Sequence, residues 1–396
     1  MEIACEKVGV GTMFRHCSGQ YRGIEARMHR PSKARTWRSH RTLELPDDSQ
    51  FISLGLCLAH NGAAGIWSPS ALASAQLAVA ELNQRDGIAG RQVRLVCINA
   101  CDESSDFEDT LLRTIETHGV EALVGMHTST VRERIVQAVG GMLPYVYTPL
   151  YEGGEVTPGV FTLGETPAQQ LRPAVEWLSR HEKSKRWLFV GNDYVWPRVS
   201  HRLAKTYVEQ SGGMVMNSMY FPIGTEDFSA VFDCVNNLQA DAVLVSLVGH
   251  DAITFNRQFG HAGLNRRAVR LSCAIEENVL MGIGSDKSEG LYVAASYFAD
   301  LQTDANLALQ ERFNTLHGIR APVLNALGQS AYEGMHFLAA IFNQNLHMPE
   351  HWAHIAKRNL SYQSARGASY MGNHLKNSPI YLARANGHQF QVVTKF

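Results

Sequence analysis

Long apolar stretches are missing from this chain of 396 residues. None approaches the roughly 20 residues with which a helix spans a bilayer, so we expect no membrane contact. Met1 to Gln50 also lacks the basic start, the apolar stretch of roughly 7–15 residues and the cleavage site of a secretory signal. These absences predict a soluble, cytoplasmic protein in which Met1 to about Asp48 is an appended arm or reflects a translation start placed too early.

Motifs of the common enzyme sites are scarce as well. The chain has no G-x-S-x-G elbow, H-E-x-x-H pair or Walker A loop, and neither Gly9-Val10-Gly11 nor Gly282-Ile283-Gly284 continues as a dinucleotide fingerprint. Cys97 and Cys101 form an isolated pair without a histidine at zinc-site spacing. The sequence therefore predicts a protein that is not an enzyme and carries no metal or other cofactor.

Cysteine content and net charge bound the class of protein further. Seven cysteines cannot all pair within one chain, and Cys57, Cys97 and Cys273 lie in apolar runs where a buried thiol is common, which favours a reducing compartment. A net charge of -1 gives no overall attraction for nucleic acid. Between Arg15 and Arg41, eight Lys or Arg residues face one acid. We interpret that stretch as a solvated, poorly ordered arm and expect no direct nucleic-acid binding.

The pattern becomes regular from Phe51 onward. Short runs rich in Val, Ile and Leu alternate with longer amphipathic stretches, which is typical of β-α-β units around a mostly parallel sheet. The first block contains predicted strands at Phe51–Ala59, Val93–Asn99, Ala122–Gly125 and Pro144–Thr148. Predicted helices separate them, at Pro69–Gln84, with an N-cap signature at Ser68, and at Ser105–Thr117 and Thr130–Val139.

A second block repeats this pattern. Strands are predicted at Trp187–Gly191, Met214–Phe221, Ala242–Val248, Val269–Cys273 and Leu291–Phe298. Helices are predicted at Pro197–Gln210, Asp227–Leu238, Asp251–Phe259, just after Glu276, and at Ala305–His317 and Asn325–Gln344. The predicted fold class is α/β, with two Rossmann-like lobes joined by a hinge. Residues 51–165 with 299–396 form the first lobe, residues 166–298 the second, and residues 1–50 the arm.

The strand ends are the places to look for a binding site. Ligands of open parallel sheets bind beyond the carboxyl ends of the strands, and two such sheets facing each other across a hinge enclose a cleft. The segments expected to line this cleft are Ala59–Trp67, Met126–Thr130, Thr148–Gly154, Gly191–Pro197, Val248–Asp251 and Cys273–Glu277.

Two of these strand ends carry recognisable motifs, Tyr147-Thr148-Pro149-Leu150-Tyr151-Glu152-Gly153 and Gly191-Asn192-Asp193-Tyr194-Val195-Trp196-Pro197-Arg198. They resemble the AmiC-like amide-sensing regulators, a branch of the type I periplasmic-binding-protein superfamily that includes short-chain amide and urea binders. Further similar stretches follow in the same order along the chain, at Leu77–Asn83, Leu123–Gly125, Gly212-Gly213 and Val248-Gly249. The resemblance covers roughly Phe51 to Gln344 and implies the type I periplasmic-binding-protein fold.

The resemblance also implies a ligand, a partner and contact residues. Members close over a small aliphatic amide, and the cytoplasmic member restrains an RNA-binding transcription antiterminator. By position, Ser129 matches the serine that holds the amide, Tyr147 the tyrosine beneath it, and Tyr194 an aromatic residue from the second lobe.

Three positions depart from the family pattern. His127 stands where the family has tyrosine, while Pro149 and Leu150 stand where it has threonine and proline. An amide-binding hydroxyl is therefore missing unless Thr148 replaces it.

The residue types are compatible with a neutral amide, which presents N–H donors and one carbonyl acceptor and needs hydroxyl and backbone groups around it. Thr128, Ser129, Thr130, Tyr147 and Thr148 supply such groups. Ser129 could equally be the N-cap of the helix that follows, and the two roles can coexist. Backbone N–H groups at that helix start could also face a carbonyl or a carboxylate.

Other candidate residues have ordinary structural alternatives. Tyr194 and Trp196 either stack on an apolar part of the ligand or only pack at the edge of a sheet. Trp67 is interpreted as a packing or surface residue in preference to a lid. Glu276 and Glu277 either recognise an amine or occupy a helix N-terminus that favours acids.

Two functions remain open. The leading prediction is a cytoplasmic sensor that binds short aliphatic amides or related compounds and controls a transcription antitermination regulator of amide and nitrile catabolism. The alternative is the substrate-binding protein of an ABC transporter for amides, urea or branched-chain amino acids. A homodimer is possible, although no exposed apolar stripe indicates one.

Overall fold

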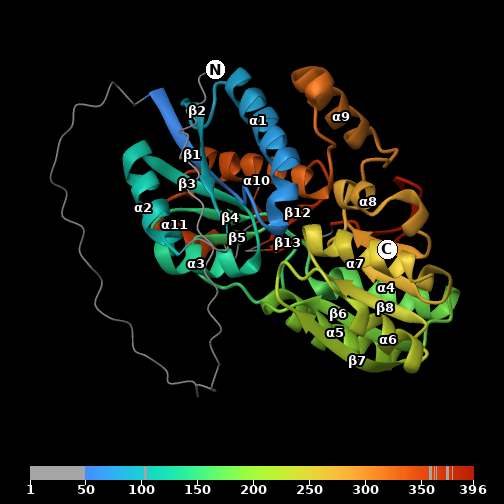
Figure 1. Ribbon diagram of the computed structural model, residues 1–396. Coiled ribbons are helices and arrows are strands. Elements are labelled where there is room, and N and C mark those ends of the chain that lie inside the picture. The colour runs from blue at the N-terminus through green and yellow to red at the C-terminus, as the bar shows by residue number, and fades with distance from the viewer. Residues whose placement is uncertain are drawn as a thin grey trace, which may run out of the picture. The chain divides into compact units, whose positions relative to one another are not determined.

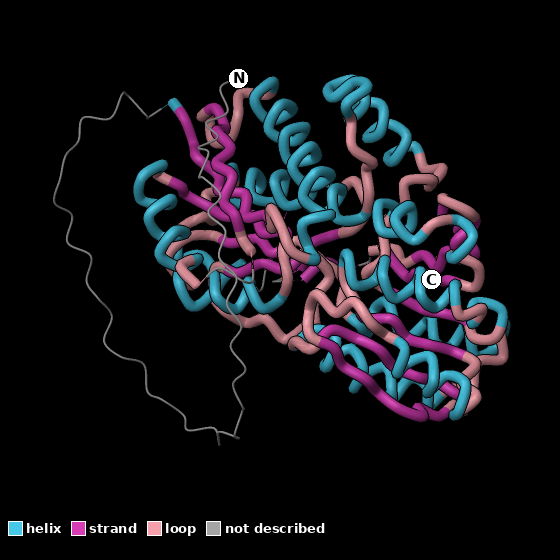
Figure 2. The backbone as a smooth tube through the Cα atoms, viewed as in Figure 1, coloured by secondary structure: helices cyan, strands magenta, loops and turns pink. Residues whose placement is uncertain are grey.

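The computed structural model describes residues 50–101, 105–355, 359–360, 362, 364–371, 374–376 and 378–396. The predicted N-terminal arm, with its basic stretch, lies outside these residues except for its last position. The described strands form two separate sheets, each with helices packed on it (Figures 1 and 2). Among the described residues, no helix is both long and apolar enough to cross a membrane.

The first sheet has eight strands in the order β11-β12-β13-β5-β4-β3-β1-β2. Its strands are β1 (Phe51–Leu58), β2 (Gln92–Asn99), β3 (Val120–Met126), β4 (Tyr145–Tyr147), β5 (Val160–Thr162), β11 (Asn359–Leu360), β12 (Ser369–Met371) and β13 (His374–Lys376). The helices of this part are α1 (Ser68–Gln84), α2 (Phe107–His118), α3 (Ser129–Val139), α9 (Asp304–His317), α10 (Ala326–Asn343) and α11 (Pro349–Ile355). Strands β1 to β5 pair in parallel, as β-α-β units require.

The second sheet has seven strands in the order β15-β14-β10-β9-β8-β6-β7. Its strands are β6 (Arg186–Asn192), β7 (Met214–Phe221), β8 (Ala242–Ser246), β9 (Val269–Ser272), β10 (Leu291–Ala295), β14 (Tyr381–Asn386) and β15 (Gln389–Lys395). The helices that accompany it are α4 (Pro167–His181), α5 (Val195–Gln210), α6 (Ser229–Asn237), α7 (Gly249–His261) and α8 (Glu277–Ile283). The chain passes from the first sheet to this one after β5 and returns after β10.

The end of the chain corrects the predicted extent of the first lobe. The sequence assigns all of 299–396 to that lobe, but β14 pairs antiparallel with β10 of the second sheet, and β15 pairs with β14. The chain therefore crosses a third time between β13 and β14. The physical reason is that β10 would otherwise be an edge strand with unpaired backbone groups, which β14 satisfies.

Alternation along β1 divides the first part into two cores. Leu54 and Leu56 belong to the core that includes α1 and α10, which pack against each other (Figure 1). Cys57 belongs to the other core, with Leu111 of α2 and Ile135 of α3. Because successive side chains of a strand face opposite sides, one apolar strand supplies both layers of helices.

Two cysteines are buried as predicted, Cys57 and Cys273, but Cys97 is exposed. Cys97 lies on β2, the outermost strand, where the neighbouring Ile98 points into the core and Cys97 points away from it. Burial raises the pKa of the Cys57 thiol to about 12, so this thiol behaves as a core side chain.

Both sheets reverse their strand order at one strand. In the first sheet β1 lies between β2 and β3, and in the second β6 lies between β7 and β8. Right-handed crossovers then place the helices before and after the reversal on opposite faces of each sheet. The crevice that opens at such a point is the usual ligand position. The segments after β1 and β6 therefore define where the two sheets present a site.

Candidate functional site

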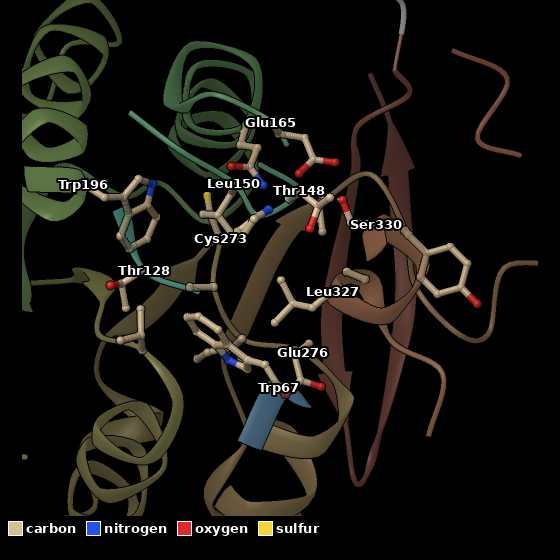
Figure 3. A pocket seen from close by; sticks show the side chains of 18 of the residues that line it. Trp67, Thr128, Thr148, Leu150, Glu165, Trp196, Cys273, Glu276, Leu327 and Ser330 are labelled. Atoms are coloured by element: carbon tan, nitrogen blue, oxygen red, sulfur yellow. Dashed lines mark hydrogen bonds between the residues drawn. The ribbon is translucent and has the colours of Figure 1, made fainter. Parts of the chain in front are cut away.

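A pocket lies at the carboxyl ends of both sets of parallel strands. It contains about 710 Å³ of empty space, counting the part open to solvent. Its lining comes from the segments after β1, β3, β4, β6, β8, β9 and β10, and from α10. In Figure 3, Trp67, Thr128, Trp196 and Leu327 are seen around this space.

All eight residues predicted as ligand contacts line this pocket: His127, Thr128, Ser129, Tyr147, Thr148, Pro149, Tyr194 and Trp196. The first six come from the ends of β3 and β4 in the first sheet, and the last two from the end of β6 in the second. The structure thus brings them to one place, and their role as ligand contacts stays a prediction.

Ser129 is not the N-cap of α3. That position belongs to Thr128, whose backbone is extended, and Ser129 is the first helical residue. The Ser129 hydroxyl instead donates to Glu152 Oε2 at 2.7 Å. The Ser129 side chain is therefore held by a carboxylate from the loop after β4 and does not cap its own helix.

His127, Tyr145 and Tyr147 form a buried cluster beside Ser129 at the pocket. His127 Nδ1 lies 3.0 Å from the carbonyl oxygen of Thr128, and Tyr145 Oη lies 3.1 Å from His127 Nε2. Burial lowers the pKa of His127 to about 4, so the ring is neutral at pH 7. A Cβ on Gly125 would lie 2.5 Å from His127 Nε2, which explains the glycine at that position of β3.

The three residues at the end of β4 have different roles. The Thr148 hydroxyl donates to the carbonyl oxygen of Gly125 at 2.9 Å, so its proton is committed to the first sheet and only its oxygen can meet a ligand. Ser330 of α10 donates to the carbonyl oxygen of Thr148. Pro149 and Leu150 contribute apolar side chains to the pocket wall. Any contact of Thr148 with a ligand would therefore use its oxygen as an acceptor and not its proton as a donor.

Aromatic side chains form much of the remaining wall. Trp67 ends the 3₁₀ helix Ala63–Trp67 and lines the pocket, as expected for the segment Ala59–Trp67. It is 5% exposed, so of the packing and surface positions that the sequence left open it takes the packed one. Tyr194 and Trp196 from the start of α5 have ring centroids 6.4 Å apart. The indole N–H groups of Trp67 and Trp196 are buried and have no hydrogen-bond partner among the described residues.

Charged residues of the wall are paired or buried. Arg366 Nη1 donates to Glu165 Oε1 at 2.8 Å, and the two side chains are 3% and 9% exposed. Glu276 is the N-cap of α8, where its carboxylate accepts from the backbone N–H groups of Asn278 and Val279. This contact accounts for Glu276 as the acid of a helix start, one of the two roles left open by the sequence.

Burial raises the pKa of Glu276 to about 7 and that of Glu277 to about 8. Glu277 Oε1 accepts from the backbone N–H of Ala299, while Glu277 Oε2 is buried without a partner among the described residues. Glu277 therefore keeps open the other role, contact with a ligand N–H or O–H group.

Sequence reasoning missed several lining residues, namely Glu165, Gln170, Tyr297, Phe298, Ala326, Leu327, Ser330 and Arg366. Tyr297 and Phe298 could have been found, because they follow β10 as the other contacts follow their strands. Arg366 could not, because it reaches the pocket from a late segment whose sequence has no strand-end signal. Within the described ranges, no group of three or more His, Cys, Asp and Glu side chains could hold a metal ion.

This two-sheet architecture with a pocket at the strand ends matches a known family. A model described as periplasmic binding protein matches residues 52–389. The chain belongs to this family. Its members are non-enzymatic binding proteins, which confirms the prediction of a non-catalytic binder and of the two-lobed α/β fold.

Solved structures of similar fold include other solute-binding proteins. A periplasmic binding protein from Burkholderia mallei is 15% identical, with a TM-score of 0.75 and coverage of 88% of this chain and 95% of that chain. An ABC transporter solute-binding protein from R. palustris in complex with 4-hydroxybenzoate is 18% identical, with a TM-score of 0.76 and coverage of 87% and 97%. The leucine binding protein LivK from Thermotoga maritima is 17% identical, with a TM-score of 0.73 and coverage of 87% and 98%.

At these identities the likeness shows the fold alone. The family match supports the coarser part of the sequence resemblance, the type I periplasmic-binding-protein fold. None of the three similar structures is described as an amide sensor, and none carries evidence of a protein partner.

Proposed function

We propose that this protein is a solute-binding protein whose pocket holds a small neutral molecule with an amide or urea head group and an apolar remainder. The observation that carries the proposal is the charge state of the described pocket wall. Arg366 is already paired with Glu165, and His127 is neutral at pH 7 because burial lowers its pKa. No described lining residue is therefore an uncompensated cation that could balance a carboxylate.

Two groups of lining residues suit such a molecule. In the polar group, Ser129 and Tyr147 lie beside the first turn of α3, whose backbone N–H groups have no carbonyl of their own helix to bind. Elsewhere on the wall, Trp67, Tyr194 and Trp196 offer flat apolar surfaces that can stack on a hydrocarbon or ring. A head group that both donates and accepts hydrogen bonds fits the polar group.

Transport is the role that the comparisons favour. The similar structures include ABC transporter solute-binding proteins, which supports delivery of the solute to a permease over regulation of a partner. The motifs around Tyr147 and Tyr194 are the reason to retain the second candidate, a cytoplasmic amide sensor that controls an RNA-binding antiterminator. The two roles use the same pocket and differ in partner and compartment.

A thermal-shift screen tests the ligand class. The purified protein is heated with acetamide, butyramide, benzamide and urea, and in parallel with leucine, butyrate and benzoate. Specific binding raises the unfolding temperature, because only the folded state binds the ligand. Stabilisation by at least one amide or by urea is expected. Stabilisation by leucine or by the carboxylates alone would contradict the neutral-ligand proposal but leave solute binding intact.

The role is tested separately. Capture of an RNA-binding protein that depends on the ligand favours the sensor, whereas export of the native protein favours the transport component.

A further inference from the structure

A buried ion-pair cluster lies directly behind Ser129 of the pocket wall. Glu152 Oε2 accepts from the Ser129 hydroxyl at 2.7 Å, and Glu152 Oε1 accepts from Arg132 Nη2 at 2.7 Å. Arg132 Nε also lies 3.4 Å from Glu155 Oε2. The side chains of Arg132, Glu152 and Glu155 are 6%, 7% and 9% exposed. Glu152 does not line the pocket itself and reaches it only through Ser129.

The chain places Glu152 there by a sharp turn. Gly153 and Gly154 both have positive φ, at 89° and 84°, a conformation that glycine adopts without steric cost. Arg132 lies on the first turn of α3, three residues after Ser129, so one carboxylate can reach both side chains. The contact with Ser129 is thus part of the folded loop and not a chance surface contact.

The carboxylate fixes which way the Ser129 proton points. An ionised carboxylate can only accept, so Ser129 must donate its single proton to Glu152 and turn its oxygen lone pairs elsewhere. The Tyr147 hydroxyl likewise donates to the carbonyl oxygen of His127 at 2.9 Å. The Ser129 and Tyr147 oxygens lie 3.4 Å apart, both on the pocket wall, so a donor from the ligand can bridge them.

The net charge of the Arg132, Glu152 and Glu155 cluster also disfavours an anionic ligand. Arg132 carries one positive charge against the two carboxylates of Glu152 and Glu155, so the cluster has a net negative charge close to the start of α3. That charge offsets the partial positive charge of the helix N-terminus, which would otherwise attract an anion. Burial alone would lower the pKa of Arg132, but the attraction of Glu152 outweighs it and the pKa is raised.

We propose that Glu152 is a positioning residue that sets ligand selectivity: by accepting the Ser129 proton it makes Ser129 an acceptor, so that the pocket takes amide N–H groups and rejects the matching carboxylates. The inference rests on the proposed function and deepens it. A primary amide can donate to Ser129 and accept from the backbone N–H groups of α3. A carboxylate of the same shape brings a second acceptor against an acceptor.

The variant Glu152→Gln tests the proposal. Its carbonyl oxygen is expected to face Arg132, because the alternative sets two donors against each other, and its NH₂ group then donates to Ser129. The Ser129 proton is released into the pocket, and Ser129 becomes a donor. The measurement is calorimetric affinity at about pH 7.5, where carboxylic acids are ionised, for the pairs benzamide and benzoate, and butyramide and butyrate.

The wild-type protein is expected to bind the amide of a pair at least about tenfold more tightly than the acid. Glu152→Gln is expected to reduce this ratio of amide affinity to acid affinity at least about tenfold, because one hydrogen bond is reversed. Glu155→Gln is the matched control, because it removes the same charge from the cluster without touching Ser129. It is expected to change the ratio less than about threefold. An equal change in both variants, or an unchanged ratio in Glu152→Gln, overturns the proposal.

A second variant covers the case in which Glu152→Gln does not fold. Ser129→Ala removes the oxygen that faces the ligand, so it is expected to weaken the amide and leave the acid unchanged or tighter. Equal weakening of amide and acid overturns the proposal. Wild-type protein that prefers benzoate overturns it too but keeps solute binding. Wild-type protein that binds neither series overturns both the amide class and the role of Glu152.

Discussion

A single added methyl group at Gly249 is expected to separate the two walls of the pocket. Gly249 begins α7 in the second part of the fold, directly after the pocket residue Val248, and has a φ of 52°. A Cβ at this position would lie 1.7 Å from the carbonyl oxygen of Ala63, which belongs to the segment after β1. The neighbour is backbone and cannot rotate away as a side chain would.

The size of the effect depends on how many molecules still reach the closed arrangement. Real Cβ atoms keep at least 3.0 Å from other heavy atoms, so Gly249→Ala must move the segments of Ala63 and Gly249 apart. If the ligand needs the closed arrangement, the measured Kd rises by the inverse of the fraction of molecules still closed. A closed fraction of about one tenth raises Kd about tenfold, which is about 1.4 kcal/mol.

The assay compares Gly249→Ala with Gly263→Ala. Gly263 also has positive φ, at 71°, but a Cβ there would meet nothing within 4 Å. Both variants therefore carry the backbone strain of alanine in the left-handed region, and only one carries the clash. We expect the two to unfold at similar temperatures, whereas Gly249→Ala alone weakens binding of the best ligand from the screen. Equal affinities in the two variants would refute the reasoning.

Two further predictions concern the charged wall. Arg366→Leu leaves Glu165 buried without its cation and is expected to cost about 3–5 kcal/mol of unfolding free energy. The double variant with Glu165→Leu is expected to recover most of this loss. Chemical denaturation measures both, and a double variant as unstable as the single one would contradict the ion-pair explanation. Glu277 has a folded pKa of about 8 against about 4.3 unfolded, so the folded state binds its proton more tightly, and stability is lost as pH rises between these values by up to about 1.4 kcal/mol per pH unit. Glu277→Gln should flatten this slope in unfolding temperature measured against pH, and an unchanged slope would assign it to another group.

The sequence predicts much of the fold because each β-α-β unit is a local pattern. The strand at Met214–Phe221 is predicted with its observed bounds, and the predicted helix Asp251–Phe259 differs by two residues at each end. The helix Pro167–His181 was missed, because Pro173 interrupts its pattern. Its capping box between Thr166 and Gln169 is the signal that could have revealed it.

Pairing between distant segments is what the pattern cannot predict. Strand β14 belongs to the second sheet because β10 has an open edge, a fact that exists only once the sheet has formed. Arg366 is likewise 201 positions from Glu165, and no spacing rule relates them. The candidate contacts at Ser129 and Tyr194 were accessible to sequence reasoning because they follow strands, and strand ends meet at one edge of a parallel sheet.

The polarity of a hydroxyl is a further step away from the sequence. Ser129 read alone is a donor and an acceptor, or a helix cap, and each choice implies a different ligand. Only the neighbour that takes its proton decides between them, and that neighbour, Glu152, lies 23 positions along the chain. Because an amide and a carboxylate differ in little else than hydrogen-bond polarity and charge, we expect ligand identity in this pocket to depend on a residue that does not line it.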